Sequence, residues 1–388
     1  MGVKGRMIVI ADDITGAAEI AGIASSQGKP VRLLCGCPVS GDRVAANTTV
    51  VIATDTRSMT EPEAVAETQR IILSLSFLRP DGSKRPLVER EGAGERLFKK
   101  TDSALRGHVV AELAALMQAT GYRRAVYLPA NPSKGRYIRA GLYYIGEKPI
   151  AETDFRFDPE YPAATSVLQE RFPDAAAHHI LMLDAESMED IRRVVAEYDD
   201  GHTLFAGAAD LYESLTSGPS PRGEGSGHTQ GQTPYTPLSP WRGAGSEALI
   251  LCGSTQSRPL DLDIPVRPMP AAIYDGSNDL TLWNTDAYAE THSLILTIPH
   301  THRTGKDVAV HLRTMMAAKA KALVAQHLPD HLIIEGGATA WATVQALGWH
   351  DFTIVRQLAP GVVQMRAQCG TLVTLKPGSY PWGGIFLK

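Results

Sequence analysis

Short apolar stretches recur along the first half of the chain and alternate with longer segments of helical pattern. The apolar stretches occupy residues 7–10, 31–34, 49–53, 125–128 and 180–183, and a helical pattern covers residues 61–75. Uniformly apolar strands that alternate with helices are typical of a parallel sheet covered by helices. We therefore predict an α/β fold with a mainly parallel sheet flanked by helices.

The alternation stops at residues 216–247, which are rich in glycine, proline and serine. Such a composition cannot bury a core and predicts a flexible low-complexity linker. Beyond it, strands are predicted at 248–252, 331–335 and 372–375, and a helix at 307–327. A chain of 388 residues has room for two domains. We predict an N-terminal domain over residues 1–215, a linker over 216–247 and a C-terminal domain over 248–388. Residues 79–94, rich in charge and glycine, are predicted to form a surface excursion.

The charge balance argues against polyanionic partners. The chain has 38 basic and 42 acidic residues and a net charge of -4, so we expect a small-molecule partner and neither nucleic acid nor a membrane surface. The chain has four cysteines, and their spacing is not that of a disulfide framework or a zinc site. We expect reduced, buried thiols at Cys35, Cys37, Cys252 and Cys369. The first apolar stretch is too short for a signal peptide core, and no apolar run reaches the roughly 20 residues of a membrane helix. These features predict a soluble cytoplasmic protein, and they leave open a homo-oligomer.

Two acidic residues follow the first apolar stretch, in the run Ala11-Asp12-Asp13-Ile14-Thr15-Gly16-Ala17. In open α/β sheets, the turn between a strand and the next helix carries ligand-binding groups. An aspartate at this place can also cap the helix, because its carboxylate accepts hydrogen bonds from unpaired backbone N–H groups. The sequence leaves both interpretations open for Asp12 and Asp13.

A second polar cluster, Lys99-Lys100-Thr101-Asp102-Ser103-Ala104-Leu105-Arg106-Gly107-His108, stands before a helical pattern at residues 109–117. Its cations, carboxylate and hydroxyl suit a small anion. The alternative is a solvated basic face, which is the usual fate of a charge run. Polar residues also follow two other predicted strands, at 54–58 and 129–132. We predict that several of these loops converge on one cleft.

The C-terminal half has three glycine-containing turns that follow predicted strands, at residues 253–257, 336–340 and 376–380. Glycine lets the backbone approach a phosphate closely, and a helix N-terminus offers unpaired N–H groups. Ser254 and Thr339 can add hydroxyl donors. The turns match neither the Walker A spacing nor the dinucleotide fingerprint. A phosphate cradle and tight packing of strand against helix explain these glycines about equally well.

Together, the motifs at residues 11–17, 99–107, 152–155 and 336–340 resemble those of the four-carbon acid sugar kinases. The resemblance spans nearly the whole chain apart from the linker. It implies phosphorylation of threonate, erythronate or 3-oxo-tetronate with ATP and Mg²⁺. It also implies that the N-terminal domain holds the sugar acid, that the C-terminal domain holds the nucleotide, and that the active site lies between the two domains.

Carried over to this sequence, the resemblance implies a role for each matching residue. The sugar-acid pocket would be lined by Asp12, Asp13, Asp55, Arg57, Lys100, Asp102 and Arg106. Either Asp12 or Asp102 would be the catalytic base. The nucleotide would be bound by Ser254, Gly336, Gly337, Thr339 and Gly378, and the resemblance identifies no metal ligand.

The chain departs from the family pattern at two C-terminal turns. Ala338 stands where the family usually has an aspartate, so a carboxylate is missing beside the expected phosphates. Pro377 and Pro381 stand in a turn that is usually rich in glycine, and each proline removes an N–H donor. The alternative hypothesis is therefore a weakened homologue that acts as a sugar-acid-binding or regulatory protein.

Several other residues favour structural roles. His300 and His302 are more typical of surface or capping positions than of metal ligands. The run Glu152-Thr153-Asp154 is predicted to order a loop, and its family match also allows a place near the substrate. Phe98 and Phe155 are predicted to be packing residues.

Overall fold

The computed structural model describes residues 6–37, 47–75, 95–158, 160–217, 247–254, 260, 262–299 and 305–378. The chain divides into two compact units. One comprises Met1–Ile20 and Lys29–Glu224, and the other comprises Ala21–Gly28 and Gly225–Lys388. The segments predicted as a surface excursion, 79–94, and most of the predicted linker, 216–247, lie outside the described residues. Thr216 ends a helix, and Glu247 leads directly into a strand.

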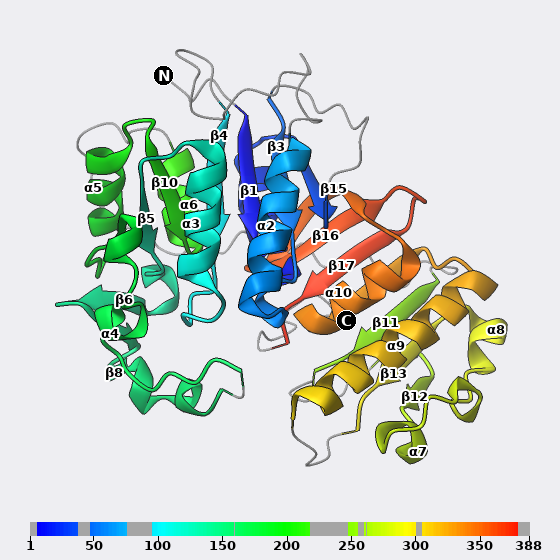
Figure 1. Ribbon diagram of the computed structural model, residues 1–388. Helices are drawn as coiled ribbons and strands as arrows, with labels where there is room; N and C mark the ends of the chain where they lie inside the picture. The colour runs from blue at the N-terminus through cyan, green and yellow to red at the C-terminus, as the bar shows by residue number, and fades with distance from the viewer. Residues whose placement is uncertain are drawn as a thin grey trace. The chain divides into compact units, whose positions relative to one another are not determined.

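The first unit is built on a seven-stranded parallel sheet in the order β2-β3-β1-β4-β10-β5-β9 (Figure 1). Its strands are β1 (Met7–Ala11), β2 (Val31–Cys35), β3 (Thr49–Ala53), β4 (Arg96–Lys100), β5 (Arg124–Leu128), β9 (Ile180–Met182) and β10 (Thr203–Gly207). The parallel α/β fold predicted from the apolar stretches is confirmed. The structure also contains strands β4 and β10, which the sequence pattern did not predict.

The helices that accompany this sheet are α1 (Ile14–Ser26), α2 (Glu61–Leu75), α3 (Val109–Thr120), α4 (Leu168–Arg171), α5 (Met188–Tyr198) and α6 (Ala209–Thr216). Most of them connect successive strands, whereas α6 follows the last strand of the sheet, and the second half of α1 is assigned to the other unit. Helices α2 and α3 lie side by side across one face of the sheet (Figure 1). Short 3-10 turns are η1 (Thr56–Ser58), η3 (Pro132–Lys134), η4 (Ile150–Glu152), η5 (Asp154–Phe157) and η6 (Ala176–His178). The helix predicted over residues 61–75 has those bounds.

A small antiparallel sheet projects from the connection between β5 and β9. It consists of β6 (Arg136–Arg139), β7 (Leu142–Ile145) and β8 (Lys148–Pro149). Tyr137 and Tyr144 face each other across it as a stacked pair, with ring centroids 5.0 Å apart. Tyr143 anchors β7, since its hydroxyl donates to the Pro129 carbonyl oxygen at 3.2 Å and also contacts the carbonyl oxygen of Ser103. The small sheet is thereby fixed beside the loop that follows β4.

The second unit has parallel strands in the order β12-β13-β11-β14-β17, extended by the antiparallel strands β16 and β15. These are β11 (Ala248–Cys252), β12 (Val266–Pro268), β13 (Leu294–Thr297), β14 (His331–Glu335), β15 (Asp351–Ala359), β16 (Val362–Ala367) and β17 (Leu372–Lys376). Its helical elements are α7 (Ala271–Tyr274), η7 (Leu280–Leu282), α8 (Ala287–Thr291), α9 (Lys306–Gln326) and α10 (Gly337–Leu347), and α9 packs along α10.

Each unit has a core of its own, because the central strands are buried along their whole length. Every residue of β1, β3, β10, β11 and β14 is buried. Phe98 is a packing residue as predicted: its ring meets that of Tyr212 edge to face at 5.4 Å. In the described part of the chain no helix is long and apolar enough to span a membrane.

No disulfide joins the four cysteines, all of which the structure describes. Cys35 and Cys252 are buried as predicted, whereas Cys37 is half-buried and Cys369 is exposed. The prediction of burial was wrong for Cys369 because it lies in the turn between β16 and β17, away from either core.

Candidate functional site

The polar loops of the first unit meet where the direction of the strand connections reverses. Strand β1 lies between β3 and β4, and its own connection leads to β2 on one side while β4 lies on the other. Ligands of open α/β sheets bind outside the carboxyl ends of the strands at such a switch point. Asp12, Arg57 and Asp102 follow these three strand ends, so the strand order brings the loops after β1, β3 and β4 together.

Arg57 and Asp12 form a two-pronged ion pair. Arg57 Nε donates to Asp12 Oδ2 at 3.0 Å, and Nη2 donates to Oδ1 at 2.9 Å. Burial raises the pKa of the Asp12 carboxyl, while the neighbouring Arg57 acts in the opposite direction. The pKa of Arg57 is raised well above its ordinary value by Asp12, Asp13 and Asp102, against the effect of burial. Asp12 is thus the carboxylate of the cluster with a raised proton affinity.

Asp13 caps helix α1, which is one of the two roles that the sequence left open, and it also pairs with Arg57. Its Oδ1 accepts a hydrogen bond at 2.8 Å from the backbone N–H of Gly16, which caps α1. Its Oδ2 also accepts from Arg57 Nη1 at 3.2 Å. Although burial raises the pKa of Asp13, Arg57 and the hydroxyl of Thr15 outweigh it, and the pKa is lowered overall. Asp13 is therefore a helix cap that also orients Arg57.

Asp102 is held by Arg106 and by the backbone of its own loop. Arg106 donates from Nε to Oδ2 at 2.7 Å and from Nη2 to Oδ1 at 3.1 Å, and the Ala104 N–H donates to Oδ2 at 3.0 Å. Arg57 Nη1 lies 3.9 Å from Oδ1. Burial raises the pKa of Asp102, but Arg57 and Arg106 outweigh it and hold the pKa far below its usual range. Asp102 is a permanent anion that anchors Arg106.

The two lysines of the cluster point to different partners, because neighbouring residues of a strand face opposite sides of a sheet. Lys99 is completely buried and pairs with Glu112 of α3. Lys100 Nζ donates to the Thr101 carbonyl oxygen at 2.9 Å and lies 3.5 Å from Glu19 of α1. Both lysines are buried, so the alternative of a solvated basic face is wrong for this pair. Their charges are compensated inside the protein.

Asp55 stabilises the 3-10 turn η1, which it precedes. The Ser58 hydroxyl donates to Asp55 Oδ1 at 3.0 Å, across the 3-10 turn that carries Arg57. The loop after β5 is likewise structural: Asn131 Oδ1 accepts from the Asp210 N–H at 3.1 Å, which joins this loop to α6. Both Asp55 and Asn131 follow a strand, as the sequence predicted. Their hydrogen bonds stabilise the loops in which they lie.

The loop between Asp102 and α3 has a tightly specified backbone. Leu105 and Gly107 adopt positive φ angles of 64° and 100°. A Cβ at Gly107 would lie 3.4 Å from Asp12 Oδ2, and a side chain there would be strained by the φ angle. This turn brings the loop against Asp12, while the Arg106 guanidinium contacts Asp102 and lies near Asp158 and the Phe155 ring.

Sequence reasoning predicted Arg57 and Arg106 but missed a third arginine near the cluster. Arg136 of β6 contacts the Ser103 hydroxyl, and its guanidinium carbon lies 5.8 Å from the centre of the Phe155 ring. Arg106 lies over the same ring at 5.9 Å, and its Nη1 is 3.6 Å from Asp158 Oδ2. Thr153 orders this loop as predicted, by accepting from the Phe155 N–H. Phe155 is thus more than a packing residue, because it supports two guanidinium groups.

In the second unit the three glycine-containing turns converge. A Cβ at Gly378 would lie 2.7 Å from Ser254 Oγ and 3.9 Å from the Cα of Gly336. A Cβ at Gly253 would lie 2.0 Å from Thr339 Oγ1. Gly336 has a φ of 99° and directly precedes Gly337, the first residue of α10. The turns after β11, β14 and β17 therefore form one surface with a helix N-terminus beside it, and glycine provides the space.

The acidic residue at this edge, Glu335, is already paired. Its carboxylate contacts Lys376 Nζ, which also donates to the Pro377 carbonyl oxygen at 3.0 Å. Ala338 is exposed, and the first turn of α10 has no acidic residue. Residues 255–257, Ser379, Tyr380 and Pro381 lie outside the described residues, as do His300 and His302. The described parts of the three turns suit an anion better than a cation.

Comparisons with known proteins agree with this division of the molecule. A sugar-binding N-terminal domain family matches residues 7–201, and a nucleotide-binding C-terminal domain family matches residues 271–380. The two matches define a protein that combines a sugar-binding and a nucleotide-binding domain. The chain belongs to the four-carbon acid sugar kinase family, as the resemblance predicted.

Relatives with assigned activities include a 3-oxo-tetronate kinase of Brucella melitensis, 26% identical, with 99% of this chain and 94% of that protein aligned. A D-threonate kinase of Cupriavidus necator is 33% identical over 38% of this chain and 31% of its own length. Among solved structures, a putative tRNA synthase from Salmonella typhimurium has a TM-score of 0.70 at 20% identity, with 98% of each chain covered. Haemophilus influenzae protein HI1011 gives a TM-score of 0.66, also at 20% identity and 98% coverage of each chain. Both structures share the fold.

Proposed function

We propose that this protein is an ATP-dependent kinase that phosphorylates a hydroxyl of a four-carbon acid sugar, namely a threonate, an erythronate or a 3-oxo-tetronate. The observation that carries the proposal is the buried cluster of Asp12, Asp13, Arg57, Asp102 and Arg106 at the switch point of the sheet. Carboxylates suit sugar hydroxyls, and a guanidinium suits a substrate carboxylate. The names of the relatives support the substrate class.

Asp12 is the better candidate for the catalytic base. A base must accept the proton of the attacking hydroxyl, and its raised pKa favours this. Asp102 accepts hydrogen bonds from Arg106 and from the Ala104 N–H, and its pKa is far below the usual range. In the proposed step, Asp12 takes the hydroxyl proton and the hydroxyl oxygen bonds to the terminal phosphorus. The bond from that phosphorus to the bridging oxygen breaks, and ADP leaves.

Arg106 is the proposed partner of the substrate carboxylate. Its side chain is 31% exposed, against 15% for Arg57, whose contacts go to three aspartates. Asp102 fixes Arg106 from one side, and the Phe155 ring supports it. Lys100 is buried and held by Glu19 and by the Thr101 carbonyl oxygen, so we propose that it supports the substrate pocket from behind the cluster.

On the nucleotide side, Ser254, Gly336, Gly337, Thr339 and Gly378 are the proposed contacts of the ATP phosphates. Gly253 and Gly378 let the side chains of Thr339 and Ser254 pack closely against the turns, which holds both hydroxyl groups beside the N-terminus of α10. This N-terminus favours negative charge. Mg²⁺ would bridge phosphate oxygens in such a transfer. Because Glu335 pairs with Lys376, we propose that phosphate oxygens and water molecules supply the ligands of Mg²⁺.

The test is a coupled ADP-release assay with Mg-ATP against D- and L-threonate, D-erythronate and 3-oxo-tetronates, with glycerate as the decoy. We expect turnover of at least one four-carbon acid and little with glycerate. Asp12→Ala and Arg106→Ala are expected to abolish turnover while keeping the melting temperature of a folded protein. Equal turnover by the wild type and both variants would contradict the assigned site.

A second candidate is a sugar-acid-binding protein with weakened kinase activity. The exposed Ala338 and the absence of an acidic residue from the first turn of α10 favour it. Thermal unfolding separates the candidates, because a ligand that binds only the native state raises the melting temperature. A kinase responds to Mg-ATP and to an acid sugar, whereas the binder responds to the acid sugar alone.

A further inference from the structure

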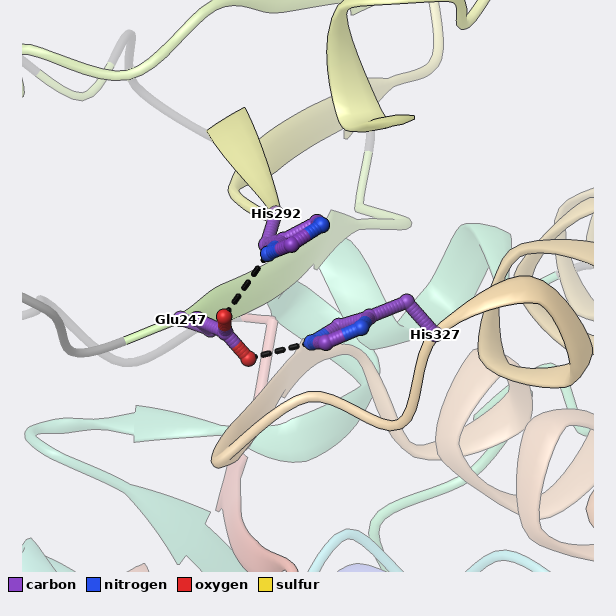
Figure 2. A group of neighbouring side chains, drawn as sticks. All are labelled: Glu247, His292 and His327. Atoms are coloured by element: carbon purple, nitrogen blue, oxygen red, sulfur yellow. Dashed lines mark hydrogen bonds and ion pairs between the residues drawn. The ribbon is translucent and has the colours of Figure 1, made fainter. Parts of the chain in front are cut away.

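Three side chains of the second unit that can ligate a metal lie together, far along the sequence from one another. They are Glu247, His292 and His327, and one ligand atom of each lies within 4.8 Å of the others. Figure 2 shows the carboxylate facing both imidazole rings. Glu247 Oε1 is 2.7 Å from His292 Nδ1, and Oε2 contacts His327 Nε2.

The three residues lie in the segments that lead into three neighbouring parallel strands. Glu247 directly precedes β11, His292 precedes β13, and His327 lies between α9 and β14. Since the strand order is β13-β11-β14, the residues share the amino edge of the sheet. Ser254 and Gly336 follow the carboxyl ends of β11 and β14, at the opposite edge. The cluster is therefore separate from the proposed nucleotide site, and its role does not depend on the proposed kinase activity.

The backbone around the cluster is held by the fold. The hydroxyl of Tyr288 donates to the His327 carbonyl oxygen at 3.0 Å, and the Ala248 N–H donates to Ser293 Oγ at 3.1 Å. His292 ends α8 in a left-handed conformation, with a φ of 51°. The chain segments that carry the ligands are thus fixed close together, and ligand binding does not have to assemble them.

The side chains remain accessible. The exposed fractions of the His292, His327 and Glu247 side chains are 39%, 33% and 27%. The two imidazole rings are stacked with centroids 3.8 Å apart and planes 7° from parallel. Nitrogens of parallel rings do not point at a single atom, so a bound ion requires one ring to rotate about its Cβ–Cγ bond. Partial exposure leaves room for that rotation.

We propose that Glu247, His292 and His327 bind one divalent transition-metal ion of the zinc class. Two imidazole nitrogens and a carboxylate oxygen are ligands that Zn²⁺ prefers, and they leave the fourth position for water. The bound ion cross-links the starts of β11, β13 and β14, and it replaces the hydrogen bonds between the imidazoles and the carboxylate. Its effect is to stabilise the amino edge of the second unit.

The test uses the full chain, stripped of metal with EDTA, dialysed and then titrated with Zn²⁺. We expect about one zinc ion to be retained per chain after gel filtration, and a melting temperature raised by roughly 5 °C at a hundredfold excess over the dissociation constant. Co²⁺ in place of zinc is expected to give the visible absorption bands of a site with nitrogen and oxygen ligands.

Variants distinguish this site from adventitious binding. The double variant His292→Asn/His327→Asn and the nearly isosteric Glu247→Gln are expected to lose the zinc and the thermal shift. His350→Asn, which removes an exposed histidine of the same unit, is the matched control and is expected to keep both. Retention of zinc by the double variant, or a wild type that neither retains zinc nor responds to it, would overturn the proposal. Melting temperatures in EDTA show whether each variant is folded.

Discussion

Arg57 binds Asp12 through two parallel hydrogen bonds of 3.0 and 2.9 Å, although 45 residues separate them in the sequence. The pairing joins the loop after β3 to the loop after β1, which are neighbouring strands. A guanidinium that holds a carboxylate in this forked geometry fixes both its position and its orientation. Asp12 is thereby held in place at the edge of the sheet where we propose that the sugar acid binds.

The first prediction separates the two candidate bases. Asp12→Asn is expected to lower kcat by a factor of about 10² to 10⁴, because it removes the proton acceptor. Asp102→Asn is expected to raise KM more than it lowers kcat, because it releases Arg106. Steady-state kinetics with the best substrate of the panel measure both. A larger fall in kcat for Asp102→Asn than for Asp12→Asn would reverse the assignment.

The second prediction concerns the acid limb of the activity profile. Burial raises the pKa of Asp12, so the base is protonated at a higher pH than an ordinary aspartate. The value of kcat is therefore expected to fall as the pH drops through this raised pKa. Asp102 cannot cause the limb, because its pKa is far below the ordinary value. A pH profile of kcat for the wild type and for Asp102→Asn should show the limb at the same pH in both proteins.

The third prediction concerns stability around Arg57. Arg57→Met leaves Asp12, Asp13 and Asp102 buried without their common counter-ion. Removing one partner of a buried ion pair costs about 3 to 5 kcal/mol, and we expect a loss of free energy of unfolding in this range. Arg192→Met, which breaks an exposed pair with Glu189, is the control and is expected to cost at most about 1 kcal/mol. Urea unfolding measures both, and equal losses would contradict the structural role of Arg57.

The fourth prediction tests the glycine turns. Gly378→Ala places a methyl group 2.7 Å from Ser254 Oγ, which forces the turns apart. We expect a loss of roughly 1 to 3 kcal/mol in the free energy of unfolding, typical of overpacking, and a weaker thermal response to Mg-ATP. Adding Ser254→Gly removes the contacting side chain and should recover much of the stability. If the double variant is no more stable than Gly378→Ala alone, the clash is not the cause.

The fifth prediction concerns His331, which is buried and lies 2.8 Å from Thr374 Oγ1. Burial, with a smaller contribution from Arg356, lowers its pKa from the ordinary 6.5 to about 4. Between these values the unfolded chain binds a proton that the folded chain does not, so stability falls as the pH drops from 6.5 toward 4. The loss approaches roughly 3 kcal/mol. In His331→Asn this dependence should be absent, and an unchanged slope in denaturant unfolding between pH 5 and 6.5 would contradict the assignment.

The sequence pattern predicted most of the parallel strands, because a strand buried on both faces is apolar throughout. Residues 49–53, 248–252 and 331–335 have the predicted bounds. Strand β4 was missed because Lys99 and Lys100 interrupt its apolar pattern. Their charges are tolerated only because Glu112 and Glu19 come from helices that the fold places against them. A local pattern does not contain such distant partners.

The site was also predicted only in part, because a local sequence pattern does not contain partners from distant segments of the chain. Asp12, Asp13 and Asp102 were recognised from their place after apolar strands and from the family motifs. Arg136 and Phe155 were missed as a guanidinium site because β6 and η5 lie in an insertion between β5 and β9, and no local spacing links either to Arg106. Glu247 was assigned to the linker, and its contact with His292 and His327 depends on the strand order of the second unit.

The sequence by itself determined the class of fold, the family and the residues that follow each strand, because apolar periodicity and motif order are local properties of the chain. Only the tertiary structure decided which carboxylate keeps a raised proton affinity. Asp12 and Asp102 have the same side chain and both follow a strand. The first is buried with its charge shared through Arg57, while the second receives Arg106 and backbone N–H groups as well. A pKa depends on burial and on the charges nearby, and these are set by how the chain folds.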